Sequence, residues 1–492
     1  MQNQSVNLKD KTILGMVWSA IQRFGIMILS FISNLILARL LSPDDFGAVG
    51  MLAIFIALSS NFIDGGFGAA LVQKSHPTQK DYSTIFYWNL SLAIFLYILM
   101  WHCAPIIASF YGINMLCQLL RFQALILIIN SLGLIQRTML RKQMLFKKIA
   151  MVDLNSSVIS VIVAICFAYV GFGVWSLVIY QITLSVCQTL GLWITHRWIP
   201  SFIFDIKSFR SLFRFGGFLL ISDLLNTICD NIQGLIIGKQ FTPAVMGYYA
   251  QAKKLEEVPT TSLSNIVSQV TFPVFSSLKN DASASLVAHR KCICTTNFIN
   301  IPLMLLLIVI ARPLIILLFT VKWIESVPYF QILCFAGLAN CLQSINYQLY
   351  VANGHSKSMF KWNLLKRGIG ILLILIGSLI GIKGILWGMV ISFWFTYFIY
   401  ARLAGRITGY TLCKQLCDQI PVFVASLLSC FVVYLLVDFI QVENTLQMVV
   451  QIFLFISSFL ILSYILKIEA LNIYRQIITN ILMKIIIKQK HR

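Results

Sequence analysis

Ionisable and amide side chains occur at helical spacing inside the long apolar segments of this chain. The sharpest set is Asp223, Asn226, Asp230 and Gln233, spaced three, four and three residues apart on one helix face. An ionisable residue inside a membrane-spanning helix is costly and is a functional candidate by default. Carboxylates and amides on one face could bind a polyhydroxylated solute, a proton or a sodium ion. We predict that this face lines a hydrated cavity.

Other apolar segments contribute further polar candidates to the same predicted cavity. They are Arg23 with Asn34, then Asp64, then Lys253 with Glu257, and finally Asn340 with Gln343. Helix-to-helix hydrogen bonding is the alternative role for the amides, since it is common in membranes. Lys253 and Glu257 stand four residues apart and could simply neutralise each other.

The composition requires a membrane around these segments. The chain has 492 residues, of which 59% are hydrophobic and 11% are charged, and its mean hydropathy is +0.84. Soluble globular domains of ordinary composition do not approach these values. The apolar runs are continuous and about 20 residues long, which fits spanning helices and not an outer-membrane barrel. The N-terminus is polar, and we expect no cleaved signal peptide.

We expect about fourteen spans. They lie near residues 13–37, 44–72, 84–108, 115–137, 150–170, 173–195, 212–238, 243–272, 295–319, 327–352, 362–381, 383–404, 418–438 and 446–466. The net charge of +21 would suggest nucleic acid in a soluble protein. Most Lys and Arg fall in alternate loops and the tail, as the positive-inside rule predicts, so both termini are expected to be cytoplasmic.

A repeated turn organises these spans into two halves. Arg39, Pro43 and Gly47 lie between the first two spans, and Lys239, Pro243 and Gly247 recur about two hundred residues later. Ser-Pro or Thr-Pro begins a helix because proline fits the first turn, where its missing N–H is no loss. The echo of Arg23-Phe24-Gly25 in Arg214-Phe215-Gly216 supports a duplication.

The duplication predicts an all-α integral membrane protein built from four parts. These are an N-terminal six-helix lobe over 1–205, a C-terminal six-helix lobe over 206–410, two additional spans over 411–466 and a basic cytoplasmic tail over 467–492. The tail is amphipathic and either lies on the anionic inner membrane surface or is a frayed helical end.

Catalytic and metal chemistry find little support in the sequence. The loops on the predicted outer side are short, so no extramembrane domain holds an active site. The twelve cysteines are scattered, mostly inside apolar runs, and form no zinc pattern. We expect no enzyme activity, no metal and no cofactor apart from coupling to H+ or Na+.

Several stretches carry a resemblance to a known family. ARLLSPDDFGAVGM, DGGFGAALVQK, PTQKDYSTIFYWNL, APIIASFYG and GFGVWSLVIYQ resemble the Wzx-type polysaccharide flippases, in particular the colanic and teichuronic acid exporter branch of the multidrug/oligosaccharidyl-lipid/polysaccharide exporter superfamily. In the second half, GYYAQAKKLEEVP is similar to a family stretch. The resemblance thins toward residue 405, and beyond it the last two spans match only in being hydrophobic.

This resemblance implies two pseudo-symmetric six-helix lobes around a central cavity, with two extra C-terminal helices. It implies alternating access that moves an undecaprenyl-pyrophosphate-linked repeat unit across a bacterial inner membrane, for O-antigen, capsule or exopolysaccharide, with other polysaccharide assembly proteins as partners. Arg23 matches the helix-one arginines thought to meet the pyrophosphate or acidic sugars. Asp223 and Asp230 depart from a purely cationic family cavity.

Two other functions stay open from the sequence. A cation-coupled drug antiporter of the same superfamily would share the fold and need a carboxylate in its first lobe, which Asp64 could supply. A membrane enzyme acting on lipid-linked glycans would need paired catalytic groups in a sizeable outer loop, and the sequence offers none.

Overall fold

The computed structural model describes residues 2–437, 444–476 and 479, and its regular structure over these residues is helical, without strands. Contacts divide the chain into two compact units, Met1–Gly247 and Tyr248–Arg492. Most of the predicted tail, residues 477–478 and 480–492, lies outside the described residues.

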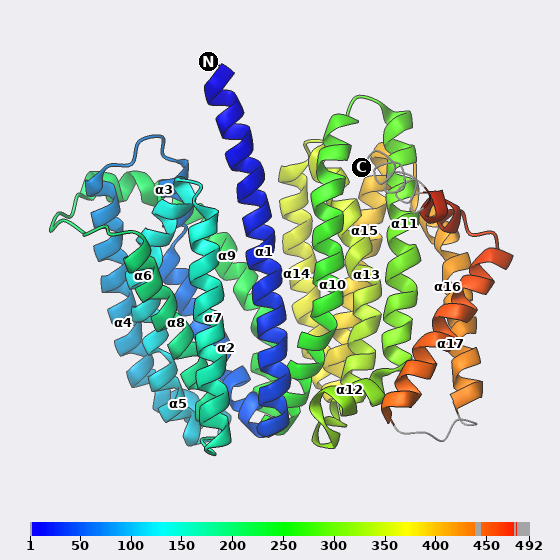
Figure 1. Ribbon diagram of the computed structural model, residues 1–492, viewed down its shortest axis with the longest axis horizontal. Coiled ribbons are helices and arrows are strands. Elements are labelled where there is room, and N and C mark those ends of the chain that lie inside the picture. The colour runs from blue at the N-terminus through cyan, green and yellow to red at the C-terminus, as the bar shows by residue number, and fades with distance from the viewer. Residues whose placement is uncertain (1, 438–443, 477–478, 480–492) are drawn as a thin grey trace, which may run out of the picture. The chain divides into compact units, whose positions relative to one another are not determined.

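The helices of the first unit begin with the longest one in the chain (Figure 1). They are α1 (Gln2–Leu40), α2 (Pro43–Asp64), α3 (Phe67–Gln73), α4 (Gln79–Tyr111), α5 (Met115–Gln123), α6 (Leu125–Lys142), α7 (Phe146–Tyr169), α8 (Trp175–Thr195) and α9 (Ile206–Gln240).

The second unit continues from α10, whose first turn belongs to the first unit. Its helices are α10 (Pro243–Ser277), α11 (Ala282–Val309), α12 (Ala311–Phe319), the short 3-10 helix Val321–Trp323, α13 (Ser326–Ala352), α14 (Ser356–Ser378), α15 (Ile382–Thr408), α16 (Leu412–Val437) and α17 (Asn444–Ile465).

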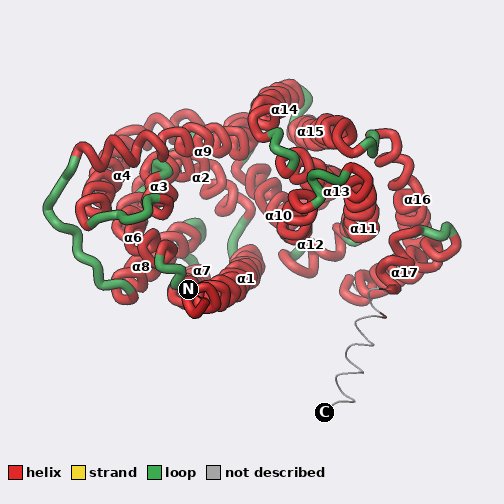
Figure 2. The backbone as a smooth tube through the Cα atoms, turned by 90° about the horizontal axis from the view of Figure 1, so that it is seen from above, coloured by secondary structure: helices red, strands yellow, loops and turns green. Residues whose placement is uncertain are grey.

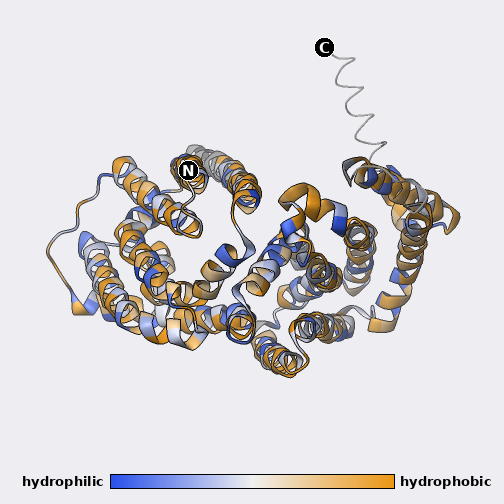
Figure 3. Cartoon of the chain, turned by 90° about the horizontal axis from the view of Figure 1, so that it is seen from below, coloured by the Kyte–Doolittle hydropathy of each residue, from blue (hydrophilic) through white to orange (hydrophobic). Residues whose placement is uncertain are grey.

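The predicted fold class is confirmed. Within the described residues, 10 helical segments are long and apolar enough to cross a membrane, and Figure 3 shows apolar residues along the helices of both units. Helices α10, α13 and α14 are long enough but more polar, and they are not among the 10. The protein is therefore a multi-pass membrane protein, and fourteen is an approximate count of its spans.

Three of the predicted spans contain a break between two helices. The span predicted near 44–72 divides into α2 and α3 at Gly65 and Gly66, whose φ angles of 53° and 69° are left-handed. Glycine adopts such angles without the steric cost of a Cβ atom. The other two breaks separate α5 from α6 and α11 from α12. Hydropathy averaged over a window does not reveal them because apolar residues resume within a few positions of each break, although Asp64-Gly65-Gly66 was a local turn signal.

The repeated turn brings two glycines against two prolines within the first unit. Ser42 caps α2, where its hydroxyl accepts the backbone N–H of Asp45 and the Asp45 carboxylate accepts the backbone N–H of Ser42 at 2.9 Å. A Cβ on Gly47 would overlap the carbonyl oxygen of Pro243, and a Cβ on Gly247 would overlap that of Pro43. Only glycine allows these two helix starts to approach so closely.

Arg39 and Lys239, the basic residues of this repeated turn, lie in the last turns of α1 and α9. The Nζ of Lys239 donates to the carbonyl of Phe110 at the end of α4 and lies 4.5 Å from the centre of the Phe110 ring. A cation near the carbonyl end of a helix is favourable.

Helix α9 packs with the first unit, although the repeat places it at the start of the second half. It lies against α2, α3 and α4, as the view in Figure 2 also shows. The boundary between the compact units therefore falls between residues 247 and 248 of the chain. The boundary predicted from the sequence repeat falls between residues 205 and 206. The repeat boundary stays a prediction.

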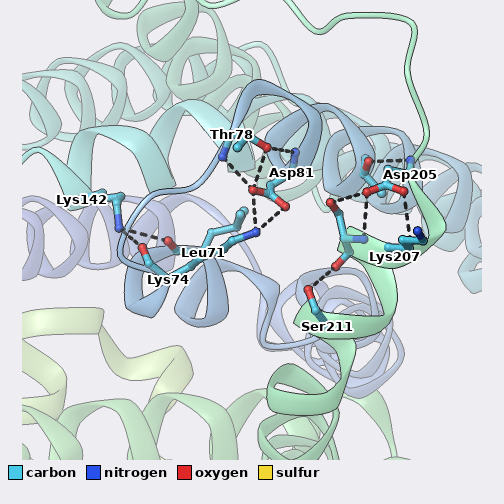
Figure 4. A network of polar contacts seen from close by, with 10 residues as sticks. Leu71, Lys74, Thr78, Asp81, Lys142, Asp205, Lys207 and Ser211 are labelled. Atoms are coloured by element: carbon cyan, nitrogen blue, oxygen red, sulfur yellow. Dashed lines mark hydrogen bonds and ion pairs between the residues drawn. The ribbon is translucent and has the colours of Figure 1, made fainter.

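Polar contacts hold the connection between α3 and α4 in a fixed shape (Figure 4). Asp81 is fully buried and accepts the Lys74 ammonium at 2.7 Å, together with the backbone N–H and hydroxyl of Thr78. Lys142 on α6 donates to the carbonyl of Lys74 at 2.5 Å. Asp205 caps α9 by accepting the backbone N–H of Ser208 at 3.1 Å.

Candidate functional site

The polar stripe predicted on α1 divides into an exposed end and a buried end. Arg23 is exposed, whereas Asn34 is 6% exposed. Eleven residues, or about three turns, of α1 separate them, and the helix is more buried around Asn34. Arg23 is therefore the member of this pair that is accessible to a solute.

Helices α2 and α9 contribute a second group of polar residues in the first unit. Asn61 donates its side-chain N–H to the hydroxyl of Thr227, which joins the two helices. Asp64 is exposed at the end of α2, and both Arg141 and Asp223 act on it electrostatically. The structure thus brings together Asp64 and Asp223, which the sequence could only assign to separate segments.

The four-residue polar face predicted on α9 is only partly accessible. Asp223 and Asp230 are exposed and Asn226 is partly exposed, but Gln233 is 5% exposed. The Gln233 amide donates to the backbone carbonyl of Asp230 at 2.5 Å. Gln233 therefore stabilises its own helix, and the two carboxylates are the accessible acids of this face.

The second unit encloses its polar residues in a small cavity of about 110 Å³. Lys253 and Glu257, two of the predicted residues, line it from α10, and the ammonium lies 3.8 Å from the carboxylate. Asn340 lines it from α13, and Phe393 and Met389 from α15 provide an apolar wall. The cavity offers both signs of charge, but its volume corresponds to a few water molecules, because each fills about 30 Å³.

Glu256 also lines this cavity, although it was not among the site residues predicted from the sequence. Its side chain is 8% exposed, and its Oε1 accepts the Thr260 hydroxyl at 2.6 Å. Gly337 on α13 leaves room for it, because a Cβ there would lie 2.7 Å from the same oxygen. No cation of the described chain lies within 4.0 Å of this carboxylate. Its position beside Glu257 was the available signal, but sequence alone cannot tell which of two adjacent glutamates is buried.

Gln343 lies beside the cavity and does not line it. It is 6% exposed and donates to the side-chain oxygen of Asn340 at 2.9 Å, which orients the Asn340 amide. Its own Oε1 has no partner among the described residues.

One ion pair of the first unit with a buried carboxylate was not predicted from the sequence. Arg137 on α6 forms a two-pronged ion pair with Asp153 on α7, at 2.6 and 3.0 Å. Gln22 on α1 donates to the same carboxylate at 2.5 Å, and Asp153 is 2% exposed. Neither residue was among the predicted site residues, although Asp153 lies inside the apolar span expected near 150–170, which was a usable signal.

No group of three or more His, Cys, Asp or Glu side chains that could hold a metal ion occurs among the described residues. Exposed polar faces in the first unit and a small cavity lined by charged and apolar residues in the second are the features that a polar solute could meet.

Comparison with known proteins points to polysaccharide assembly. Residues 36–328 match the model of a family described as polysaccharide biosynthesis protein. The chain is 26% identical over 365 residues to the teichuronic acid biosynthesis protein TuaB of Bacillus subtilis (strain 168), covering 73% of this chain and 74% of that protein. It is 25% identical over 438 residues to the succinoglycan biosynthesis transport protein ExoT of Rhizobium meliloti (strain 1021), covering 88% of each.

A solved structure shares the fold. The lipid II flippase MurJ in an inward closed conformation superposes with a TM-score of 0.74 at 18% sequence identity, covering 94% of this chain and 100% of that one. At this identity the likeness concerns the arrangement of helices.

Proposed function

This chain belongs to the polysaccharide biosynthesis protein family, and we propose that it is a flippase that moves a lipid-linked oligosaccharide across the bilayer without a chemical step. The family predicted from the sequence is thereby confirmed. The observation that carries the proposal is the set of charged side chains left exposed on apolar helices of the first unit, namely Arg23, Asp64, Asp223 and Asp230. Charge is expensive in hydrocarbon and is kept where it meets water or a polar solute.

These residues suit the physical task of moving a glycan through the hydrocarbon of the membrane. Each hydroxyl or amide of a glycan moved into hydrocarbon without a partner costs roughly 2–7 kcal/mol, so a bare oligosaccharide does not cross on a useful timescale. Fixed donors and acceptors replace water along the path. In this proposal Arg23 meets the anionic phosphate or an acidic sugar, since a guanidinium pairs well with such groups, and the amides of Asn226 and Asn340 meet hydroxyls.

Further details belong to the same proposal. The substrate is an undecaprenyl-pyrophosphate-linked repeat unit, the membrane is the bacterial inner membrane, and transport proceeds by alternating access. Coupling to H+ or Na+ through Asp223 or Asp230 is energetically useful, because one charge crossing 100 mV is worth about 2.3 kcal/mol. TuaB and ExoT are named for polysaccharide biosynthesis and transport, which supports this substrate class.

The orientation of the chain in the membrane is inferred from the basic residues in and beside the connections between helices. The connections after α3 and α8 contain Lys74 and Arg197, and the helix ends beside the connections after α6 and α8 carry Lys142, Lys147, Lys148 and Lys207, whereas the connections after α1, α4 and α7 contain no basic residue. In this proposal the basic connections and both termini lie in the cytoplasm, as the positive-inside rule predicts. Other proteins of polysaccharide assembly are expected partners on that side.

Gene deletion followed by analysis of the surface polysaccharide and of the lipid-linked oligosaccharide pool tests this function. We expect loss of the surface polymer and accumulation of finished repeat units on the inner leaflet. Complementation with Arg23→Ala, Asp223→Ala or Asp230→Ala should fail while the variants insert, whereas Asp44→Ala, which removes an exposed carboxylate at the start of α2, should restore export. An unchanged pool with reduced efflux of small cations would identify an antiporter instead.

A further inference from the structure

The face of α1 that lies on α7 is defined by close packing along the helix. A Cβ on Gly15 would come within 2.8 Å of the Phe146 ring, and a Cβ on Gly25 would come within 2.6 Å of a methyl group of Leu154. The two glycines stand ten residues apart, about 80° around α1, and both face α7, because Phe146 and Leu154 belong to that helix. They allow close approach, but smooth apolar surfaces of this kind resist rotation of a helix only weakly.

One polar contact lies on this same face. Gln22 follows Gly15 by seven residues and donates to Asp153 at 2.5 Å. Arg137 occupies both oxygens of that carboxylate, at 2.6 and 3.0 Å, so the acceptor is charged, oriented and 2% exposed. A hydrogen bond to a charged acceptor is stronger than one between neutral groups. It is also directional, and apolar packing is not.

The rotation of α1 decides which of its flanks is exposed. Arg23 follows Gln22 by one residue, or about 100° around the helix, and it is exposed. The opposite flank is apolar and also exposed, and it consists of Leu14, Val17, Ile21, Phe24, Ile28 and Ile32. A rotation of α1 by about a quarter turn would bring Arg23 onto α7 or the apolar flank onto the polar side. The rotational position of α1 therefore matters for function.

We propose that Asp153, held by Arg137, is a positioning residue that fixes the rotation of α1 through Gln22 and so keeps Arg23 clear of α7. The role given to Arg23 rests on the proposed function, whereas the rotation itself does not. A single buried polar contact that sets helix register is the best-attested use of buried polar groups. Here the pair Arg137 and Asp153 acts as a preformed acceptor on the first unit, and Gln22 is the contact on α1.

Thiol labelling measures the rotation directly. Arg23→Cys and Phe24→Cys are made separately in the full chain, which is placed in lipid nanodiscs and treated with a water-soluble methanethiosulfonate. Mass spectrometry then gives the rate at each site. Because the reactive species is the thiolate, a cysteine facing hydrocarbon reacts slowly. We expect Cys at position 23 to react faster than Cys at position 24.

The variant that breaks the contact is Gln22→Met, which keeps an unbranched chain of similar length and removes the donor. The ratio of the two rates should fall by about tenfold, the shift expected when a hydrogen bond to a charged acceptor is lost. Leu29→Met is the matched control, because it alters the same helix face two turns later and should leave the ratio unchanged. Gln22→Asn combined with Asp153→Glu moves one methylene across the contact and should restore the ratio.

The outcomes separate the two claims. An unchanged ratio in Gln22→Met, or a fall in Leu29→Met as large as that in Gln22→Met, would overturn the positioning role, since general loosening of α1 would then explain the result. Failure of the compensating pair to restore the ratio would also count against it. If Arg23→Ala leaves glycan export intact, the substrate role of Arg23 fails, and the labelling ratio still decides the rotation.

Discussion

The two compact units treat their charged residues in opposite ways. In the first unit the buried carboxylates of Asp81 and Asp153 are paired with Lys74 and Arg137, whereas Asp64, Asp223 and Asp230 are exposed. In the second unit Glu256 is buried beside a small cavity, with a neutral hydroxyl of Thr260 as its partner. The free-energy cost of burying a carboxylate differs according to whether a cation is buried beside it.

This difference indicates which charged residues stabilise the fold of each unit. A fully paired, desolvated ion pair is destabilising to break, because the partner stays buried and uncompensated. A buried carboxyl with only a hydroxyl partner gains little from its charge. Mutations of the two acids, Asp153 and Glu256, should therefore have opposite signs.

The largest effect is expected at the paired acid. Asp153→Leu leaves Arg137, which is partly exposed, without its anion and should lower the free energy of unfolding by about 3 kcal/mol, the lower end of the range for a fully buried pair. Thermal unfolding in detergent, followed by size-exclusion chromatography, measures this. The double variant Arg137→Met with Asp153→Leu removes both charges and should recover most of the loss. A single variant as stable as the parent would show that the pair is not structurally important.

The packing around Glu256 provides the next effect. Gly337→Ala places a Cβ 2.7 Å from both Glu256 Oε1 and the sulfur of Met304, and overpacking of this kind costs about 1–3 kcal/mol. The matched control is Gly368→Ala on α14, where a Cβ meets nothing within 4 Å and should be neutral or slightly stabilising. Equal melting temperatures for the two variants would indicate that the cavity wall relaxes freely.

The unpaired acid itself should show the opposite sign from Asp153. Glu256→Gln keeps an oxygen that can accept the Thr260 hydroxyl and removes the buried charge, so stability should stay constant or rise by about 1 kcal/mol. Glu256→Leu removes the acceptor as well and serves as the comparison. A loss from Glu256→Gln as large as that from Asp153→Leu would mean that Glu256 is held by a cation after all, and the contrast between the units would fail.

The smallest effect concerns matched helix caps outside the spans. Asp205 begins α9 in the first unit and Asp281 begins α11 in the second, and hydrogen bonds from backbone and side-chain groups of Ser208 and from Ala284 and Ser283 hold the pKa of each below its ordinary 3.8. Each cap therefore stabilises the protein above about pH 4, and this contribution is lost as pH falls through the lowered pKa.

Asparagine at either position keeps a capping oxygen but cannot titrate. Melting temperatures of Asp205→Asn and Asp281→Asn between pH 5 and pH 3 should fall slightly less than that of the parent, and by a similar amount in the two units. A steeper fall in either variant would contradict the direction of the pKa shift.

Local sequence features predicted most of the fold. Hydropathy and length located the apolar helices, and Pro43 and Pro243 marked two helix starts because proline suits the first turn. The same features missed the break at Gly65 and Gly66, since the apolar run resumes at Phe67 and the average hydropathy stays high. The candidate site was predicted less well, because helical spacing shows which residues share a face but not whether that face is open.

The membrane class, the family and the repeated turn could be predicted from the sequence, since these features follow from composition and from neighbours along the chain. Only the tertiary structure decided that Gln22 reaches Asp153, 131 residues away, and that Glu256, not Glu257, is buried against Gly337. Pairing and enclosure depend on which helices pack together and in what rotation. In a chain where nearly every helix is apolar, hydropathy does not distinguish one packing partner from another.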